Sequence, residues 1–225
     1  MSKCDQCIIR QFNSLKSLTK EDLVRVSGCK TTKTIKKGQT IFEEGEMING
    51  VYCIKDGVCK LSKLSANGKD QIVKLVVRGD LLGQRSLISE EAANLSAIAI
   101  NDMEVCFIPK HEIIHDLQQN VRFSMDMLKD MADELKIADD IIVNMAQKSV
   151  KQRLAETLVY IFDNFGVNEQ GYLNVILSRE DYANIVGTAT ESAIRILSQF
   201  KKEGLISTSG KQIKIEDLDL LKRVE

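Results

Sequence analysis

The chain has 225 residues, of which 44% are hydrophobic and 28% charged, with one proline and no tryptophan. This composition is typical of a globular protein with one sizeable core or two modest domains, and no apolar run approaches the roughly 18 residues of a membrane-spanning helix. The 31 basic and 32 acidic residues give a net charge of −1, so no global field attracts nucleic acid. Six cysteines without a secretory segment indicate a reducing compartment, and we expect a cytoplasmic protein without a membrane partner.

The N-terminal segment carries Cys4 and Cys7 in a C-x-x-C spacing, and apolar residues at helical spacing then predict a helix over 12–29. A C-x-x-C pair can hold zinc or an iron–sulfur cluster, but either needs about four ligands and the other candidates are scattered. Cys53 and Cys106 lie in apolar runs typical of strands, where a small buried thiol is the ordinary interpretation. Cys4 and Cys7 are therefore weak candidate metal ligands, or a redox-active or incidental pair.

Short β-rich runs separated by turn residues predict a jelly-roll or similar double-sheet barrel, a fold that often encloses a ligand. Asp56-Gly57 and Asn67-Gly68 are typical of hairpin turns. The expected strands are Thr40–Phe42, Val51–Ile54, Val58–Leu61, Gln71–Val76, Ser96–Ile100 and Glu104–Ile108.

A polar segment between the last long strands is a candidate effector pocket. If Gly83 turns the backbone and Ser86 opens a short helix, the exposed amides of this segment can bind an anion. A polar connection across the barrel, without any ligand, fits the sequence equally well. The candidate pocket residues are Gly83, Gln84, Arg85, Ser86, Leu95 and Ser96.

Pro109 is well placed to begin a short helix over 111–117, which carries His111 and His115 one turn apart. Such a pair can bind a metal or a haem, but we see no acidic or cysteine ligand nearby. We therefore interpret both as surface histidines.

The longest helical pattern covers Val121–Gln147 and repeats apolar residues at alternating spacings of three and four, which is a heptad pattern. Such a row packs either on the β-rich domain of its own chain or on the same helix of a second chain. We favour self-association in parallel, because a two-fold dimer would present two DNA-reading helices about one DNA turn, ~34 Å, apart. The predicted dimer seam is Leu128, Met131, Leu135, Ala138, Ile142 and Met145.

The last third of the chain predicts a helix-turn-helix followed by a small basic hairpin, the wing. Ser178 and Asp181 have the spacing of a capping box that begins the first helix, and Gly187 allows the turn into the second. The wing is expected around Ser209-Gly210, and a short strand is expected at Leu173–Leu177.

The second helix of this pair is expected to turn polar side chains outward. Glu191 and Arg195 are one turn apart, so they can brace each other while Arg195 binds a guanine and Glu191 accepts from a cytosine amine. The alternative is an ordinary ion pair on the solvated face of a small interaction module. The candidate DNA-binding residues are Ser178, Arg179, Thr188, Thr190, Glu191, Ser192 and Arg195.

The predicted fold class is therefore α+β, in three parts. Residues 1–118 form an N-terminal segment and β-roll sensor domain, 119–147 a dimerisation helix, and 148–225 a winged helix-turn-helix domain. Because no nucleophile–base pair or complete metal set is present, we do not expect an enzyme.

This order of parts resembles the Crp/Fnr family over nearly the whole chain. The most specific matches are Ile185–Gly187, Glu191 with Arg195–Leu197, and Gly204–Ile206 followed by Gly210-Lys211. The resemblance implies a homodimeric transcription regulator, whose β-roll senses a small molecule or redox state and which binds a palindromic operator in double-stranded DNA, with RNA polymerase as a further partner. It also implies base contacts by Glu191 and Arg195, and backbone-phosphate contacts by Ser178 and Arg179.

The resemblance leaves the effector and any cofactor unknown. Cyclic-AMP receptors of the family carry a glutamate and an arginine where this chain has Gln84 and Leu95, and leucine cannot pair with phosphate, so we do not expect cyclic AMP. The oxygen-sensing Fnr branch has an N-terminal cysteine cluster plus a distal cysteine, whereas Cys4, Cys7 and Cys29 are spaced differently. Haem, an iron–sulfur cluster, an unknown anion and regulation without an effector stay open. The alternative function is a cyclic-nucleotide-type ligand-binding regulatory module without DNA binding.

Overall fold

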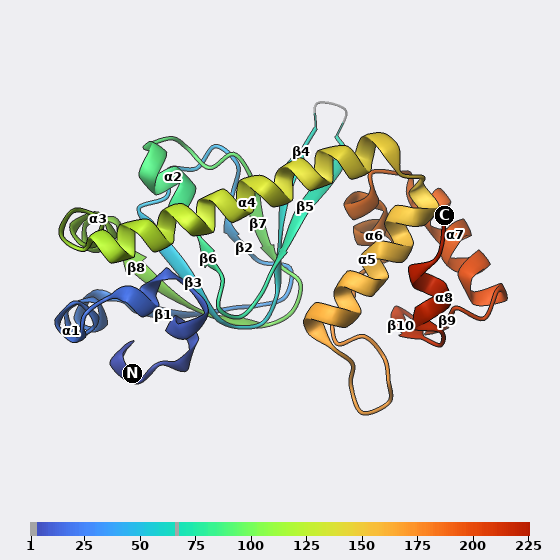
Figure 1. Cartoon of the computed structure of the whole chain (residues 1–225), viewed down its shortest axis with the longest axis horizontal. Helices are drawn as coiled ribbons and strands as arrows, with labels where there is room; N and C mark the ends of the chain where they lie inside the picture. The colour runs from blue at the N-terminus through green and yellow to red at the C-terminus, as the bar shows by residue number, and fades with distance from the viewer. Residues whose placement is uncertain (1–3, 66–67) are drawn as a thin grey trace. The chain divides into compact units, whose positions relative to one another are not determined.

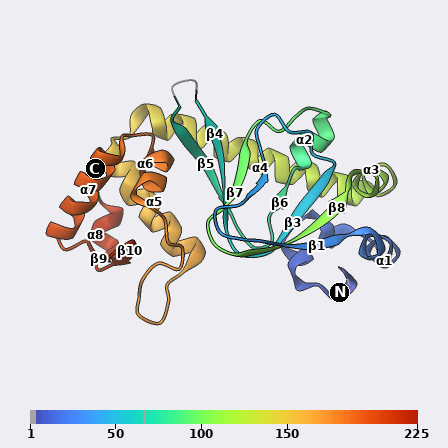
Figure 2. The ribbon, with the colours of Figure 1, turned by 180° about the vertical axis from the view of Figure 1, so that it is seen from behind.

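The computed structural model describes residues 4–65 and 68–225. The chain divides into two compact units, which are described separately. The β unit comprises the residues up to Lys63 together with Val73–Ile137, and the C-terminal unit comprises Leu64–Ile72 together with Ala138–Glu225. Figures 1 and 2 show the elements of both units from opposite sides.

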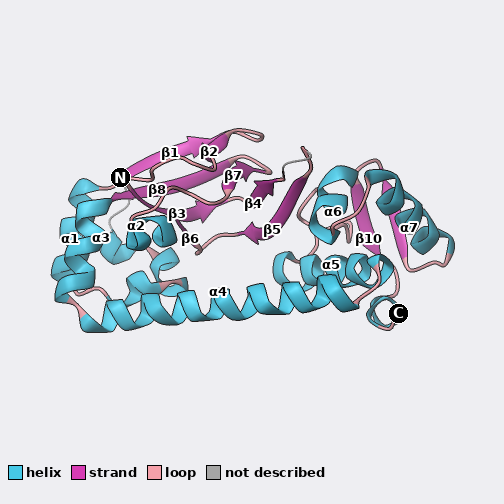
Figure 3. Ribbon diagram, turned by 90° about the horizontal axis from the view of Figure 1, so that it is seen from above, coloured by secondary structure: helices cyan, strands magenta, loops and turns pink. Residues whose placement is uncertain are grey.

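Two four-stranded sheets confirm the predicted double-sheet fold, and Figure 3 shows their strands with the helices around them. The first sheet has the order β1-β8-β3-β6 and the second β2-β7-β4-β5. The first four strands of the chain are β1 (Thr31–Ile35), β2 (Thr40–Phe42), β3 (Gly50–Asp56) and β4 (Cys59–Leu64). The others are β5 (Asp70–Val76), β6 (Leu81–Leu82), β7 (Ser96–Ala99) and β8 (Met103–Pro109). Strands β1 and β6 were not predicted, since β1 is almost wholly exposed and β6 has two residues.

The predicted hairpin at Asp56-Gly57 is wrong. Strand β3 pairs with β6 and β8, whereas β4 pairs with β7, so these two residues carry the chain from one sheet to the other. Gly57 has φ +90°, and a Cβ atom there would lie 2.7 Å from the carbonyl oxygen of Asp102, so the crossing requires glycine. In the other predicted turn, Asn67-Gly68, Asn67 lies outside the described residues.

The continuous helix predicted over 12–29 is also wrong. Three short 3-10 segments, η1 (Cys4–Gln6), η2 (Ile8–Phe12) and η3 (Ser14–Ser17), precede α1 (Lys20–Cys29). Thr19 forms a capping box with Asp22: the Thr19 hydroxyl accepts from the Asp22 amide, and the Asp22 carboxylate accepts from the Thr19 amide. The α-helix therefore begins only at Lys20, after an extended Leu18.

Three further helices contribute to the β unit, namely α2 (Gln84–Ser89), α3 (Lys110–Gln119) and the first part of α4 (Val121–Gln147). Helix α2 begins two residues before the predicted start, because Gly83 is its N-cap in the left-handed region, with φ +89°. Helix α4 has the predicted bounds. Phe123 and Met127 of α4 are buried in the core of the β unit.

The C-terminal unit contains α5 (Val150–Phe165), α6 (Arg179–Val186), α7 (Thr190–Lys202), β9 (Ile206–Ser209), β10 (Gln212–Ile215) and α8 (Leu218–Lys222). Strands β9 and β10 pair through the two-residue turn Gly210-Lys211 and form the predicted wing. The strand predicted at Leu173–Leu177 is not formed, because within this segment only Leu173 takes part in a β-bridge, with Val167. In the described part of the chain, every helix is too short or too polar to cross a lipid bilayer.

Candidate DNA interface, sensor pocket and thiol cluster

Helix α6 begins and ends as the sequence predicts. The Ser178 hydroxyl accepts from the Asp181 amide at 3.0 Å, and the Asp181 carboxylate accepts from the Ser178 amide at 3.0 Å, which completes the capping box. Gly187 ends the helix with φ +66° and ψ +52°, a conformation that favours glycine. These two features fix where α6 begins and where it ends.

Helix α7 has one buried and one exposed face. Ala193, Leu197 and Phe200 are buried, whereas Glu191 and Arg195 are exposed. Among the described residues, the side chains of Glu191 and Arg195 form no hydrogen bond or ion pair, so the predicted bracing between them is not formed. Both side chains are thus available to a ligand.

The start of α7 has the polar character of a phosphate-binding end. Its N-cap is Ala189, which has no side-chain acceptor for the first amides of the helix. The flanking hydroxyl residues Thr188, Thr190 and Ser192 are each half-buried. Free amides at a helix N-terminus favour a bound anion.

Ser178 and Arg179, at the start of α6, are both engaged within the protein. The Ser178 hydroxyl serves the cap of α6, and half-buried Arg179 donates from Nη2 to the carbonyl oxygen of Gly210, at 3.3 Å, in the turn of the wing. Arg179 therefore positions the wing in this structure. Lys202 and Lys211 are exposed, which leaves them available for DNA phosphates.

The outer face of α4 is apolar and exposed. The side chains of Leu128, Leu135 and Ile142 are 59%, 65% and 65% exposed, and Ala138 is exposed as well. Met131 and Met145 are half-buried. Met145 lies near the turn after α6, since its sulfur would be 3.3 Å from a Cβ atom at Gly187. Four members of the predicted seam are therefore exposed to solvent, whereas Met131 and Met145 are partly covered.

A cavity of about 110 Å³ lies in the β unit, and five of the six predicted pocket residues line it. Ser96 does not line it, and its hydroxyl accepts instead from the Glu44 amide. Gln84 is only 8% exposed, and its Oε1 atom is buried without a hydrogen-bond partner. The full lining is Phe42, Ile48, Leu61, Leu81, Leu82, Gly83, Gln84, Arg85, Ser86, Ala93, Asn94, Leu95 and Glu134.

The lining carries charges of both signs. Arg85 is exposed at the cavity, the carboxylate of Glu134 is paired with Lys74 at 3.0 Å, and Leu95 offers no charge to a phosphate. The volume is also smaller than the roughly 300 Å³ at which ligand pockets begin. The unpaired Gln84 oxygen can accept a hydrogen bond from a small neutral molecule in the cavity.

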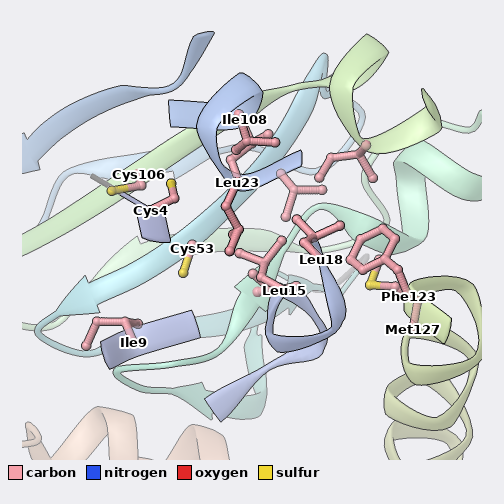
Figure 4. Close-up of a cluster of buried hydrophobic side chains, with 14 of the residues drawn as sticks. Cys4, Ile9, Leu15, Leu18, Leu23, Cys53, Cys106, Ile108, Phe123 and Met127 are labelled. Atoms are coloured by element: carbon pink, nitrogen blue, oxygen red, sulfur yellow. The ribbon is translucent and has the colours of Figure 1, made fainter. Parts of the chain in front are cut away.

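Four cysteines gather at one side of the β-unit core. Cys4, Cys53 and Cys106 belong to one buried cluster, with Cys7 packed against it, and Figure 4 shows the first three among its apolar side chains. Cys53 and Cys106 are register partners on β3 and β8. Burial, together with the neighbouring Cys106, Cys7 and Cys4, raises the pKa of the Cys53 thiol to about 12, although a hydrogen bond from Asn13 lowers it.

Sequence reasoning missed this grouping, because it judged each strand cysteine alone. Both Cys53 and Cys106 are buried in strands, as predicted. The pairing of their strands brings them together, and the register of two strands so far apart in the chain does not follow from local patterns. Cys29 is exposed and lies outside the cluster.

His111 has ligand-type neighbours that the sequence did not indicate. Within the described residues, the one group of three metal-ligating side chains whose ligand atoms all lie within 4.8 Å is Cys29, His111 and Glu112. Glu112 is buried and forms an ion pair with Arg25, so its carboxylate is already engaged. The side chains of His111 and His115 are 74% and 53% exposed, in accordance with the surface assignment.

Comparison with known proteins matches both units to described families. Residues 32–120 match the cyclic nucleotide-binding domain, and residues 152–224 match the Crp-like helix-turn-helix domain. The fumarate nitrate reduction regulatory protein of Klebsiella oxytoca is 29% identical over 97% of this chain and 88% of its own length. The fumarate and nitrate reduction regulatory protein of Escherichia coli K12 gives the same identity and coverage.

Solved structures share the fold. FixK2 from Bradyrhizobium japonicum is 25% identical with a TM-score of 0.78, over 87% of this chain and 97% of that one. A putative Crp/Fnr-family regulator from Eubacterium rectale has a TM-score of 0.77 at 21% identity, over 93% and 97% of the two chains. From the two matched domains, the long helix between them and these relatives, the chain belongs to the Crp/Fnr family of DNA-binding transcription regulators.

Proposed function

We propose that this protein is a homodimeric regulator that reads a palindromic operator, with α7 of each copy in the major groove of one half-site. Membership of the family implies DNA binding and dimerisation, and it sets aside both an enzyme and a ligand-binding module without DNA binding. The observation that carries the readout proposal is the exposed, unpartnered pair Glu191 and Arg195 on the first turns of α7.

Each side chain suits one type of base contact. The guanidinium of Arg195 can donate two hydrogen bonds to the O6 and N7 atoms of a guanine, and the Glu191 carboxylate can accept from a cytosine amine. Thr188, Thr190 and Ser192 offer shorter donors and acceptors beside them. The amides at the start of α7 and the exposed Lys202 and Lys211 supply phosphate contacts, which add affinity without sequence preference.

The exposed apolar row on α4 supports dimerisation through this helix. Phe123 and Met127 face the core of their own β unit, while Leu128, Leu135 and Ile142 are left in solvent. A helix with a heptad row on its free face is stabilised by a matching helix. A two-fold dimer reads two inverted half-sites, and this symmetry is the basis for the palindrome in the proposal.

The β unit is proposed to control this dimer in response to a redox signal or to a small effector that is not cyclic AMP. The regulated dimer would then alter transcription through RNA polymerase. Leu95, which offers no charge to a phosphate, supports the exclusion of a cyclic phosphate. The buried thiol cluster supports a redox or metal signal.

The test of the readout uses an operator selected from random double-stranded DNA with the unmodified protein. Arg195→Ala is expected to lose roughly 1–3 kcal/mol of discrimination at one guanine per half-site. Lys202→Ala is the control on the same helix, and it is expected to weaken all sequences alike and to reduce the salt dependence of binding. If Arg195→Ala also weakens all sequences alike, the assignment of Arg195 to a base is wrong.

A further inference from the structure

We propose that Cys29, His111 and Glu112 bind a zinc ion where the end of α1 meets the start of α3. The protein would supply three ligands, and water would take the fourth position of a tetrahedral ion. This site goes beyond the proposed function and does not depend on it. None of its three residues lines the cavity, and all three belong to the β unit.

The three ligand atoms already lie close together. Within the set formed by the Cys29 sulfur, a His111 ring nitrogen and a Glu112 carboxylate oxygen, every pair is within 4.8 Å. His111 Nε2 and Glu112 Oε1 are 3.3 Å apart. A tetrahedral zinc ion with nitrogen and oxygen ligands at ≈ 2.0–2.2 Å holds these two atoms about 3.3 Å apart. This pair therefore has the separation that zinc requires.

The carboxylate of Glu112 is the fixed member of the set. Arg25 pairs with its Oε2 atom only, so Oε1 is left on the side of His111. Cys29 is exposed, and the side chain of His111 is 74% exposed, so these two can adjust their rotamers around the buried oxygen. A tetrahedral zinc ion requires its sulfur and nitrogen ligands to lie about 3.6 Å apart, which is a small movement from the present distances.

The acidic surroundings of Glu112 point independently to a cation. Asp22, Glu112 and Asp116 all pair with the one guanidinium of Arg25, so their negative charge exceeds that of this partner. Glu112 and Asp116 are buried, and in the described part of the chain Oδ2 of Asp116 has no hydrogen-bond partner. Because buried charge without full compensation is costly, a divalent ion beside Glu112 would stabilise this region.

The donor set selects zinc among the common divalent ions. Thiolate and imidazole are preferred ligands of zinc, whereas magnesium and calcium prefer oxygen atoms. Zinc undergoes no redox change in proteins. The site would therefore respond to the zinc concentration and not to the oxidation state of a metal.

Zinc at this position would fix the segment that packs on α4. The Ser14 hydroxyl donates to the Met127 sulfur at 2.8 Å, and the Ser17 hydroxyl donates to the Asp126 carboxylate. The Asn120 amide in turn donates to the carbonyl oxygen of Ser17 at 3.0 Å. Helix α1 follows this segment and α3 leads into α4, so an ion that joins α1 to α3 would hold both sides of these contacts.

The test is zinc binding by the full-length protein, measured by competition with a chromophoric chelator. The unmodified protein is expected to bind one zinc ion per chain more than Cys29→Ser. His111→Ala should weaken this site more than about a hundredfold, because loss of a residue that only supports a ligand already costs 10–100-fold. His115→Ala is the matched control, since His115 is exposed one turn along α3 and outside the ligand set. Equal zinc binding by the unmodified protein, Cys29→Ser and His111→Ala would overturn the proposal.

Alkylation of Cys29 shows where the zinc is bound. Iodoacetamide, followed by mass spectrometry, is expected to label Cys29 slowly in the zinc-loaded protein and rapidly after chelation or in His111→Ala. His111→Cys is expected to restore the protection, because a thiolate also binds zinc but cannot rebuild an ion pair with Glu112. Labelling of Cys29 that is independent of zinc, or no protection in a His111→Cys protein shown to be folded by circular dichroism, would refute the site.

Discussion

Leu135→Ala tests the dimer helix, and its effect follows from the exposure of this side chain. Leu135 is 65% exposed in the single chain, and complete burial of a leucine is worth ≈ 1.5–3 kcal/mol. Burial of the exposed part contributes about 1.5 kcal/mol in each copy, and a two-fold dimer contains two copies. The substitution is therefore expected to cost about 3 kcal/mol, which raises the dimer dissociation constant about a hundredfold.

Sedimentation equilibrium over a range of protein concentrations measures this constant, and operator binding should weaken in parallel. Ile137→Ala is the matched control, because Ile137 is also exposed on α4 but lies on a different face from the row. It is expected to leave the dissociation constant nearly unchanged. A Leu135→Ala protein that sediments with an unchanged constant would refute the seam, as would an equal effect of Ile137→Ala.

Two further predictions concern local features. Ser178→Ala removes the capping acceptor of α6 and is expected to destabilise the C-terminal unit by about 1 kcal/mol, measured by thermal unfolding. Ser178→Asp should retain most of the stability, because aspartate also accepts the capping hydrogen bond. Equal losses in the two variants would contradict the capping role. Burial raises the pKa of the Cys59 thiol to about 12, so at pH 8 its thiolate fraction is small and rises with pH. Mass spectrometry after iodoacetamide treatment of zinc-free protein at pH 8 should find exposed Cys29 labelled first and Cys59 labelled only in denaturant. Rapid labelling of Cys59 in the folded protein would show that this thiol is not buried.

Local signals in the sequence were sufficient for the helix-turn-helix and the wing, but not for Leu173–Leu177, where the predicted strand is not formed. The Ser178–Asp181 capping box, Gly187 and the turn at Gly210 each act within a few residues, and all three have the predicted structure. The heptad pattern likewise gave the bounds of α4. These features depend on hydrogen bonds and backbone angles of neighbours, which sequence spacing records directly.

The wrong or missing predictions have two causes. Some elements depend on contacts with residues distant in the chain, and in one helix a local capping signal was overlooked. Thr19 and Asp22 form the same type of capping box as Ser178 and Asp181, but the apolar spacing across them suggested a continuous helix. Strand β1 is exposed, so it shows no alternation, and its pairing with β8 depends on residues more than sixty positions away. The crossing at Gly57 and the facing of Cys53 and Cys106 depend on the same long-range pairing.

The contacts of η3 with the first turns of α4 have a thermodynamic consequence. Ser14 and Ser17 connect the N-terminal segment to Met127 and Asp126, so the two regions cannot change independently. If a ligand bound in this segment strengthens the association of α4 with α4 of a second copy by some factor, dimerisation must strengthen ligand binding by the same factor. A regulator of this kind would retain such a ligand longest as a dimer on DNA and would release it most readily as a monomer. The lifetime of the signal would then depend on the number of operators as well as on the chemistry of the signal.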